Sequence, residues 1–242
     1  MTNDKVNDGD SLYIVMPAYN EEQNIENVVR QWYPILEGKG KDSRFVIADS
    51  GSNDRTHAIL LELQKEFPKL HILENTGKQH GPKLMALYDY VIDIGGDYIF
   101  QTDSDGQTDP TEFEAFWQMR KEYDGIFGHR NVREDGKDRA FVERVVCILL
   151  HLYFGIRVPD ANAPFRLMKT SVVEKYLYKM DMDYNLPNIM LVTYFVHYNE
   201  KVLFKTIRFR ERQGGENSIN IVNIVKIGWK ALGDFKRLKR DL

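Results

Sequence analysis

DYIFQTDSDGQTDP, at residues 97–110, is the segment from which the fold class is most readily inferred. Its apolar first half predicts a buried strand, and its second half is a polar loop rich in aspartate. Pro110 then predicts the start of a helix, because Asp109 can cap it and Glu112 can close a capping box. A strand that passes through a polar loop into a helix is the repeating unit of a parallel α/β sheet.

The same pattern occurs three times earlier in the chain, where apolar segments also end in polar or Gly-rich turns: SLYIVMPAYN (11–20), RFVIADSGS (44–52) and LHILENTG (70–77). Apolar residues at helical spacing fill the gaps and predict helices around Ile25–Trp32, Ile59–Phe67 and Pro82–Ile94. This alternation predicts an α/β fold with a mainly parallel central sheet, joined by right-handed crossovers and flanked by helices.

Composition limits the classes of protein to which the chain can belong. Its 33 basic and 36 acidic residues leave a formal charge of −3, so no overall cationic field indicates nucleic-acid binding. The single cysteine, Cys147, excludes an intramolecular disulfide. Residues 1–10 lack the apolar core of a secretory signal, and the apolar run Val145–Ile156 is shorter than the ~20 residues that span a bilayer. We therefore expect a cytoplasmic protein without a transmembrane helix.

Polar clusters follow three of the predicted strands, at the edge where parallel α/β sheets bind ligands. After the fourth strand, Asp103 and Asp105 flank a single residue, so both carboxylates can reach one point if the chain turns there. Mg²⁺ and Mn²⁺ are commonly held by one or two carboxylates together with substrate phosphates, and Gln107 can add an amide oxygen or bind a ligand water. The alternative is structural, because acidic turn residues also cap helices or face water.

The loops after the first two predicted strands carry groups that suit a nucleotide. Asp49 can accept a hydrogen bond from a nucleobase, Gly51 allows the backbone to approach a ligand, Tyr19 offers a ring for stacking and Glu21 offers a carboxylate. The structural alternative holds for both loops, since their Ser, Asp and Asn-Glu residues also form ordinary helix starts.

Six motifs in this order resemble those of the family-two glycosyltransferases with a GT-A fold, in particular the dolichol-phosphate (polyprenyl-phosphate) mannosyltransferase-like branch: PAYNEE (17–22), DSGSND (49–54), NTGK (75–78), TDSDGQTDP (102–110), GHR (128–130) and VPDANAPFRLM (158–168). The resemblance covers roughly residues 11–215. It implies that a sugar moves, with inversion in one direct displacement, from a nucleotide-diphosphate sugar to a lipid-phosphate or saccharide acceptor.

The resemblance also implies roles for residues at the matching positions. The nucleotide would be enclosed by Pro17, Tyr19, Glu21, Asp49, Asp54, Lys78 and Asp103. A Mg²⁺ or Mn²⁺ cofactor would be held by Asp103, Asp105 and Gln107. The catalytic set would be Asp160, Arg130 and Arg166, with the arginines as phosphate contacts and Asp160 as a general base for a hydroxyl or a positioning group for a lipid phosphate. The alternatives are structural ion pairs for the arginines and a turn role for Asp160.

The sequence departs from the family pattern in three respects. Ser50 stands where many relatives carry a second aspartate, and no transmembrane pair follows the catalytic region, so base preference and membrane mode stay open. Asn188 lies near a position where many relatives carry an acidic residue, which puts a second acceptor-side carboxylate in doubt.

The chain divides into a flexible N-terminus (1–10), a catalytic domain (11–217) and a C-terminal segment (218–242). The catalytic domain has a nucleotide-sugar half of about 11–128 and an acceptor-side half of about 129–217. In the C-terminal segment, apolar residues at helical spacing with lysines and arginines nearby predict a basic amphipathic helix. This helix either docks on a membrane surface or a partner, which would place the protein at the inner face of a membrane, or packs on the catalytic core.

Two other functions remain compatible with the sequence. One is a nucleotide-binding regulatory domain without turnover, against which the retained Asp103, Asp105 and Gln107 argue. The other is a metal-dependent nucleotidyltransferase, which would release pyrophosphate, whereas a glycosyltransferase releases a nucleoside diphosphate or monophosphate.

Overall fold

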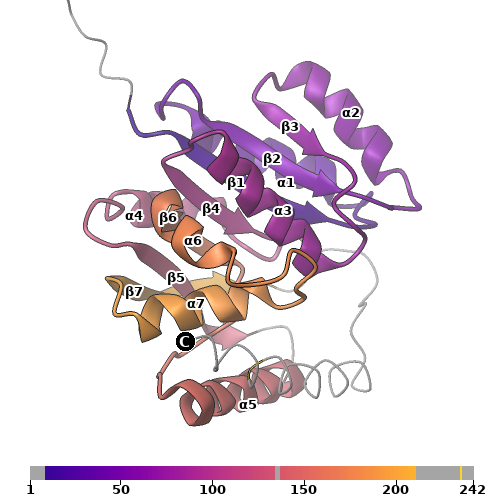
Figure 1. Ribbon diagram of the computed structural model, residues 1–242. Helices are drawn as coiled ribbons and strands as arrows, with labels where there is room; N and C mark the ends of the chain where they lie inside the picture. The colour runs from indigo at the N-terminus through magenta and orange to yellow at the C-terminus, as the bar shows by residue number, and fades with distance from the viewer. Residues whose placement is uncertain (1–8, 134–136, 211–234, 236–242) are drawn as a thin grey trace, which may run out of the picture.

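A computed structural model describes residues 9–133, 137–210 and Phe235. One mixed sheet forms the centre of the molecule, in the order β3-β2-β1-β4-β6-β5-β7 (Figure 1). Its seven strands are β1 (Leu12–Ala18), β2 (Arg44–Asp49), β3 (Leu70–Leu73), β4 (Tyr98–Thr102), β5 (Gly125–Arg133), β6 (Phe165–Lys169) and β7 (Val202–Phe209).

The sheet is parallel except for β6, which runs antiparallel to both β4 and β5. The predicted α/β fold with a mainly parallel sheet is therefore confirmed. Because β6 is reversed, its amino end lies at the same edge as the carboxyl ends of β4 and β5. The segment that leads into β6, which includes Asp160, consequently approaches the edge where the other polar loops lie.

Helices cover both faces of the sheet (Figure 1). Helices α1, α2 and α4 lie on one face and α3, α6 and α7 on the other, with α5 packed against α7. The helical segments are α1 (Ile25–Trp32), η1 (Tyr33–Leu36), α2 (Thr56–Glu66), α3 (His80–Asp93), η2 (Pro110–Glu112), α4 (Glu114–Trp117), α5 (Lys137–Phe154), α6 (Thr170–Leu177) and α7 (Pro187–His197).

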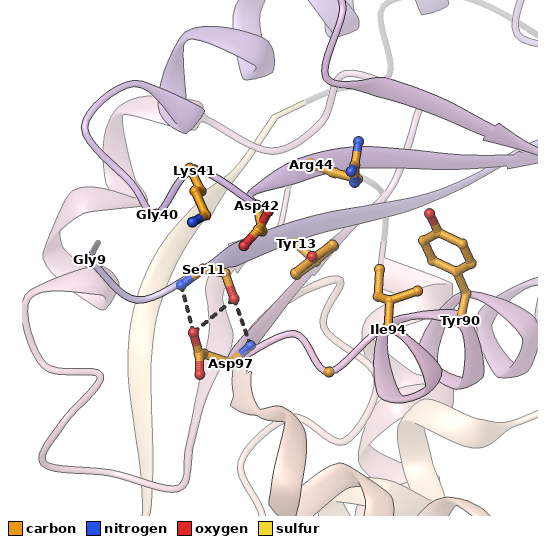
Figure 2. Close-up of a pocket in the computed structure, with 11 residues that line it drawn as sticks. Gly9, Ser11, Tyr13, Gly40, Lys41, Asp42, Arg44, Tyr90, Ile94 and Asp97 are labelled. Carbon is orange, nitrogen blue, oxygen red and sulfur yellow. Dashed lines mark hydrogen bonds between the residues drawn. The ribbon is translucent and has the colours of Figure 1, made fainter. Parts of the chain in front are cut away.

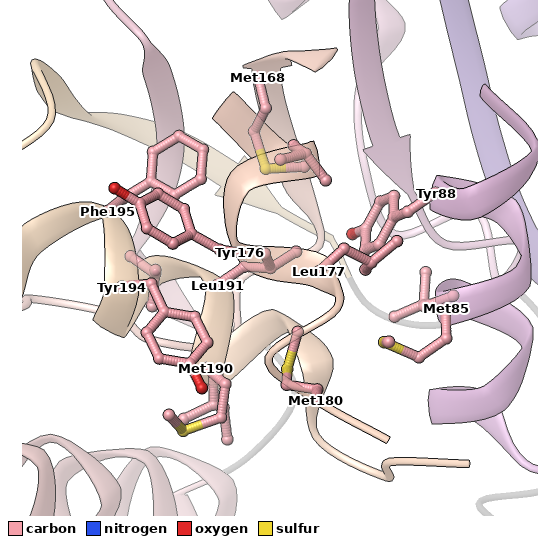
Figure 3. Close-up of a cluster of buried hydrophobic side chains, with 14 of the residues drawn as sticks. Met85, Tyr88, Met168, Tyr176, Leu177, Met180, Met190, Leu191, Tyr194 and Phe195 are labelled. Atoms are coloured by element: carbon pink, nitrogen blue, oxygen red, sulfur yellow. The ribbon is translucent and has the colours of Figure 1, made fainter. Parts of the chain in front are cut away.

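Strand periodicity divides the core into two clusters, because successive side chains point to opposite faces of a sheet. In β1, Leu12 and Ile14 pack toward α1 and α2, whereas Tyr13 and Val15 pack toward α3. The second cluster continues between α3, α6 and α7, where methionine, leucine and tyrosine side chains interdigitate (Figure 3). Helix α7 is buried along nine consecutive residues, Pro187–Phe195, as expected of a helix that is apolar on all sides.

The helix predicted to start at Asp109 is shorter and tighter than expected. A 3₁₀ turn, η2, precedes the single turn of α4, and Asp109 caps it by accepting a hydrogen bond from the Thr111 backbone N–H at 3.0 Å. In place of the capping box, Glu112 accepts from the Arg208 backbone N–H at 3.2 Å. The passage of β7 beside this turn supplies that donor, which the local sequence does not predict.

The predicted basic amphipathic helix, 218–242, lies outside the described residues apart from Phe235. Phe235 is buried, and its ring meets those of Tyr153 and Phe154 at centroid distances of 6.2 and 5.6 Å. The flexible N-terminus predicted for 1–10 also lies outside, except for Gly9 and Asp10. No helix among the described residues is long and apolar enough to cross a membrane.

Candidate active site

Hydrogen bonds link the loops that follow β1 and β2 at the carboxyl edge of the sheet. The Asn20 backbone N–H donates to Ser52 Oγ at 3.1 Å, and the Asn53 backbone N–H donates back to Asn20 Oδ1 at 2.8 Å. The Glu22 N–H donates to Asp54 Oδ2 at 3.1 Å. Asp54 thus holds two predicted nucleotide-binding loops together.

The first loop presents one of its predicted site residues to solvent and buries the others. Tyr19 is 40% exposed, which leaves its ring open for stacking, and Pro17 is buried at the end of β1. Glu21 is also buried, and its Oε2 accepts from Asn24 Nδ2 at 2.8 Å. In this structure Glu21 therefore stabilises the start of α1.

The loop after β2 places Asp49 beneath its own turn. Asp49 is 3% exposed, and its carboxylate accepts from Ser52 Oγ at 2.5 Å and lies 3.1 Å from His57 Nδ1. Lys78 lies across Gly51, where a Cβ atom would come within 2.8 Å of the lysine side chain. Gly51 also has a φ of +74°, a conformation that L residues rarely adopt. Because glycine has no side chain, position 51 leaves room for Lys78 to extend over the loop.

A lysine without a predicted role lies behind Tyr19. Lys83, on α3, is 1% exposed, its Nζ donates to the Ala18 carbonyl oxygen, and the same nitrogen lies 5.1 Å from the centroid of the Tyr19 ring. Burial lowers the pKa of Lys83 to about 8, and the negative charge of Asp49 opposes part of that shift. Its position in the helical pattern predicts only a core-facing residue, so the sequence alone does not reveal this cation.

The burial of Lys83 predicts a pH dependence of stability. Between pH 8 and 10.5 the unfolded chain holds the Lys83 proton and the folded chain releases it, so the stability of the protein should rise with pH across this window. In the Lys83→Met variant this contribution is absent. Urea unfolding of both proteins at pH 7 to 10 measures their free energies of unfolding. The value for the wild type minus the value for the variant should therefore increase as the pH rises. A difference that is flat or falls with pH would contradict this assignment.

The two residues of the Asp-x-Asp pair, Asp103 and Asp105, follow β4 and are both partly exposed. Asp103 Oδ1 accepts from Gln101 Nε2 at 3.1 Å, and Asp105 Oδ1 accepts from the Gln107 backbone N–H at 3.1 Å. Within the described part of the chain, no group of three or more His, Cys, Asp or Glu side chains is placed to hold a metal. Two carboxylates can still serve a divalent cation, since Mg²⁺ and Mn²⁺ are commonly held by one or two carboxylates together with substrate phosphates, and the metal role of this pair stays a prediction.

Gln107, the third predicted metal ligand, is engaged elsewhere. It is buried, and its Nε2 donates to the Arg210 carbonyl oxygen at 2.8 Å. The Arg210 backbone N–H donates to the Gln107 carbonyl at 2.9 Å, and its guanidinium donates to Asp109. Gln107 therefore ties the loop to the residue that follows β7, and its role toward a metal stays a prediction.

Two predicted catalytic residues are paired with each other. Arg130, at the carboxyl end of β5, donates from Nε and Nη2 to the two carboxylate oxygens of Asp160 at 2.8 and 2.9 Å. The side chains of Arg130 and Asp160 are 7% and 3% exposed. Glu143 of α5 lies 3.6 Å from the same guanidinium and accepts from the Ala161 N–H at 2.7 Å. This buried cluster fixes α5 and the loop before β6 to the sheet.

Arg166, the third predicted catalytic residue, is buried within the fold. Its guanidinium donates to the carbonyl oxygens of Ala161, Ala163 and Asn188 at 2.7, 2.9 and 2.5 Å. The charge-assisted bonds to these carbonyls fix the loop before β6 against the start of α7. A phosphate contact by Arg166 stays a prediction, and in this structure its donors face the backbone.

A cavity of about 380 Å³ opens at the opposite edge of the sheet, near the amino ends of β1, β2 and β4 (Figure 2). Asp97 accepts from the Ser11 N–H and Oγ, both at 2.8 Å, and Tyr13, Arg44 and Tyr90 also line the cavity. None of the predicted site residues borders it. The cavity therefore lies away from the predicted chemistry.

Comparison with known proteins identifies relatives along most of the chain. The model of the family described as "Glycosyl transferase family 2" matches residues 13–177. Undecaprenyl-phosphate 4-deoxy-4-formamido-L-arabinose transferase from Shewanella sediminis is 25% identical over 90% of this chain, and the enzyme of that name from Edwardsiella ictaluri is 23% identical over 88%. The chain spans about 64% of the length of these relatives.

Solved structures also share the fold. Glucosyl-3-phosphoglycerate synthase from Mycobacterium tuberculosis, in complex with Mn²⁺, UDP-glucose and phosphoglyceric acid, superposes with a TM-score of 0.70 at 14% identity, covering 96% of this chain and 80% of that chain. The same enzyme with Mg²⁺ and UDP gives a TM-score of 0.67 at 16% identity, with 86% and 73% of the two chains covered. At this identity the likeness establishes the fold.

Proposed function

This chain belongs to glycosyl transferase family 2, and we propose that it transfers a sugar from a nucleotide-diphosphate sugar to a polyprenyl phosphate. The observation that carries the proposal is the convergence, at one sheet edge, of the Asp103–Asp105 pair with the linked loops after β1 and β2. Ser104 Oγ donates to the Pro17 carbonyl at 2.9 Å and joins the two regions. The curated relatives are named for transfer to undecaprenyl phosphate, which supports the same acceptor class here.

The donor would lie over the loops after β1, β2 and β3. The exposed ring of Tyr19 would stack on the base, and Lys78, which extends across Gly51, would approach the phosphates from the other side. Asp49 would accept from the base once Ser52 or His57 gives up its contact. The structures of the synthase with UDP-glucose support a UDP-sugar as the first donor to test.

Asp103 and Asp105 would hold Mg²⁺ or Mn²⁺, which supplies Lewis-acid stabilisation of the departing nucleoside diphosphate. The protein contributes the fixed positions of these carboxylates, through Gln101 for Asp103 and the Gln107 backbone for Asp105. The structures of the synthase with Mn²⁺ or Mg²⁺ support these ions.

The pairing of Asp160 favours a phosphate acceptor over a hydroxyl acceptor. A general base needs a carboxylate lone pair within reach of the acceptor proton. Each oxygen of Asp160 already accepts two hydrogen bonds, Oδ2 from Nε and the backbone N–H of Arg130, and Oδ1 from Arg130 Nη2 and the Asn162 backbone N–H. A lipid phosphate is already anionic, so it attacks the anomeric carbon without a base. Asp160 would then position Arg130 rather than remove a proton.

Exposed apolar residues on α5 support access to a lipid substrate. Val145, Ile148 and Leu152 recur at helical spacing and are 38%, 52% and 69% exposed, with exposed Arg144 beside them. Figure 1 shows α5 at the side of the molecule away from α1 and α2. A helix with an apolar stripe and a basic residue suits the surface of an anionic membrane, so we propose peripheral association through α5.

One transfer experiment tests donor, acceptor and membrane association together. With Mn²⁺, a panel of UDP-, GDP- and TDP-sugars, and undecaprenyl phosphate in anionic liposomes, we expect a glycolipid and nucleoside diphosphate as products. The double variant Ile148→Glu, Leu152→Glu should lower this transfer at least about tenfold, because each exposed apolar side chain contributes about 1.5–3 kcal/mol on burial. Transfer to a short-chain polyprenyl phosphate in water should be unchanged.

Ile94→Glu provides the matched control, since Ile94 is 42% exposed, directly follows α3 and lines the cavity at the opposite sheet edge. Release of pyrophosphate in place of nucleoside diphosphate would indicate a nucleotidyltransferase. Nucleotide binding without any product would indicate a regulatory domain. Equal losses with both acceptors in the α5 variant would overturn the membrane role.

A further inference from the structure

Four polar side chains form a continuous chain of hydrogen bonds that leads from the interior to the Asp-x-Asp pair. Tyr88 Oη donates to Asn188 Oδ1 at 2.8 Å, Asn188 Nδ2 donates to Gln101 Oε1 at 3.1 Å, and Gln101 Nε2 donates to Asp103 Oδ1 at 3.1 Å. Tyr88, Asn188 and Gln101 belong to α3, α7 and β4, and Asp103 is in the loop that follows β4. Tyr88, Asn188 and Gln101 are each 0–2% exposed, so water does not substitute for these bonds.

The chain has one direction, because every donor points toward Asp103. The Asp103 carboxylate can only accept hydrogen bonds, so Gln101 must present its amide nitrogen to it. The Gln101 oxygen must then accept from the Asn188 nitrogen, which leaves the Asn188 oxygen to accept from the Tyr88 hydroxyl. Burial raises the pKa of Tyr88 well above its ordinary value, so this hydroxyl keeps the proton that it donates. If either amide were flipped, two donors or two acceptors would face each other.

Asn188 is held in place independently of this chain. Its carbonyl oxygen accepts from Arg166 Nη1 at 2.5 Å, and it lies in the first turn of α7, which is buried on all sides. Gln101 is held by the sheet, where it pairs with Arg166 in the register of β4 and β6. The two amides therefore connect Asp103 to two rigid elements of the core.

We propose that Asn188 and Gln101 are positioning residues that orient the Asp103 carboxylate for the divalent metal. The inference rests on the proposed function, because it needs Asp103 to be a metal ligand. Partners that hold a ligating carboxylate in place typically change metal affinity by about 10–100-fold when they are removed. Asparagine at position 188 is then required for its ability to donate and accept at once, which an acidic residue there lacks.

The test is a titration of Mn²⁺ into the full chain in the presence of saturating UDP, with free Mn²⁺ followed by electron paramagnetic resonance. Asn188→Leu, which removes the link to Gln101, should raise the Kd for Mn²⁺ by about 10–100-fold. Gln101→Met should have the same effect, and it supplies the measurement if Asn188→Leu does not fold. Neither substitution touches the nucleotide loops, so the affinity for UDP without metal should be unchanged.

Thr193→Val is the matched control. Thr193 is a fully buried polar residue on the same helix, and its hydroxyl donates to the Ile189 carbonyl at 2.7 Å, outside the chain that leads to Asp103. The Kd of the Thr193→Val variant for Mn²⁺ should stay within about threefold of the wild-type value. This change is well below the increase in Kd expected when a positioning residue is replaced. Wild-type Kd values in folded Asn188→Leu and Gln101→Met would overturn the inference. Failure of the wild type itself to bind Mn²⁺ would instead contradict the proposed metal site.

Discussion

Asp105→Ala is expected to abolish sugar transfer while the protein stays folded. A metal that stabilises the leaving diphosphate contributes several kcal/mol to the transition state, so losing a ligand should lower turnover by about 100-fold or more. The carboxylate accepts a hydrogen bond from the Gln107 N–H, and the loss of that bond should cost about 1 kcal/mol of stability. Turnover at saturating Mn²⁺ and urea unfolding of the same preparation measure the two effects.

Asp109→Asn is the control for this experiment, because Asp109 belongs to the same loop but caps η2 and pairs with Arg210. The Asp109→Asn substitution should lower the free energy of unfolding but have little effect on the affinity for the metal. Asp103→Asn should have a milder effect than Asp105→Ala, since an amide retains an oxygen ligand but loses the charge. Full activity of Asp105→Ala in the presence of a chelator would contradict the assignment of both carboxylates as metal ligands.

Asp160→Asn is expected to lower the free energy of unfolding by about 3–5 kcal/mol, because it leaves the buried Arg130 guanidinium without its paired charge. Arg130 would retain Glu143 at 3.6 Å, a longer and less direct contact. Turnover and donor affinity should fall together, because the loop before β6 and α5 both attach to this cluster. Chemical unfolding, donor binding and turnover of the variant separate these effects.

A double-mutant cycle shows whether Arg130 and Asp160 act as a pair. Arg130→Met alone should be strongly destabilising, whereas the same change in the Asp160→Asn background should cost much less. Additive losses would contradict the pairing. A stable Asp160→Asn protein that binds donor normally but has lost turnover toward a hydroxyl acceptor would restore Asp160 as a general base.

Local patterns in the sequence were enough to predict the fold class and the edge of the sheet at which the candidate site lies. Apolar runs that end in polar loops predict buried strands, and parallel strands bring their carboxyl ends to one edge. The clusters around Tyr19, Asp49 and Asp103 therefore had to lie near one another in this fold. The ordered motifs also predicted the family, which the match over residues 13–177 confirms.

Which of these polar groups form hydrogen bonds with one another depends on the tertiary structure. Asp160 pairs with Arg130, 30 residues earlier, because the reversed strand β6 returns its leading loop to the end of β5. Asn188 reaches Gln101, 87 residues earlier, because α7 starts above β4. Periodicity and turn chemistry act over a few residues, so they fix elements and their ends. Hydrogen-bond partners far apart in the chain are chosen by packing, since a buried donor or acceptor must find whichever partner the folded core places beside it.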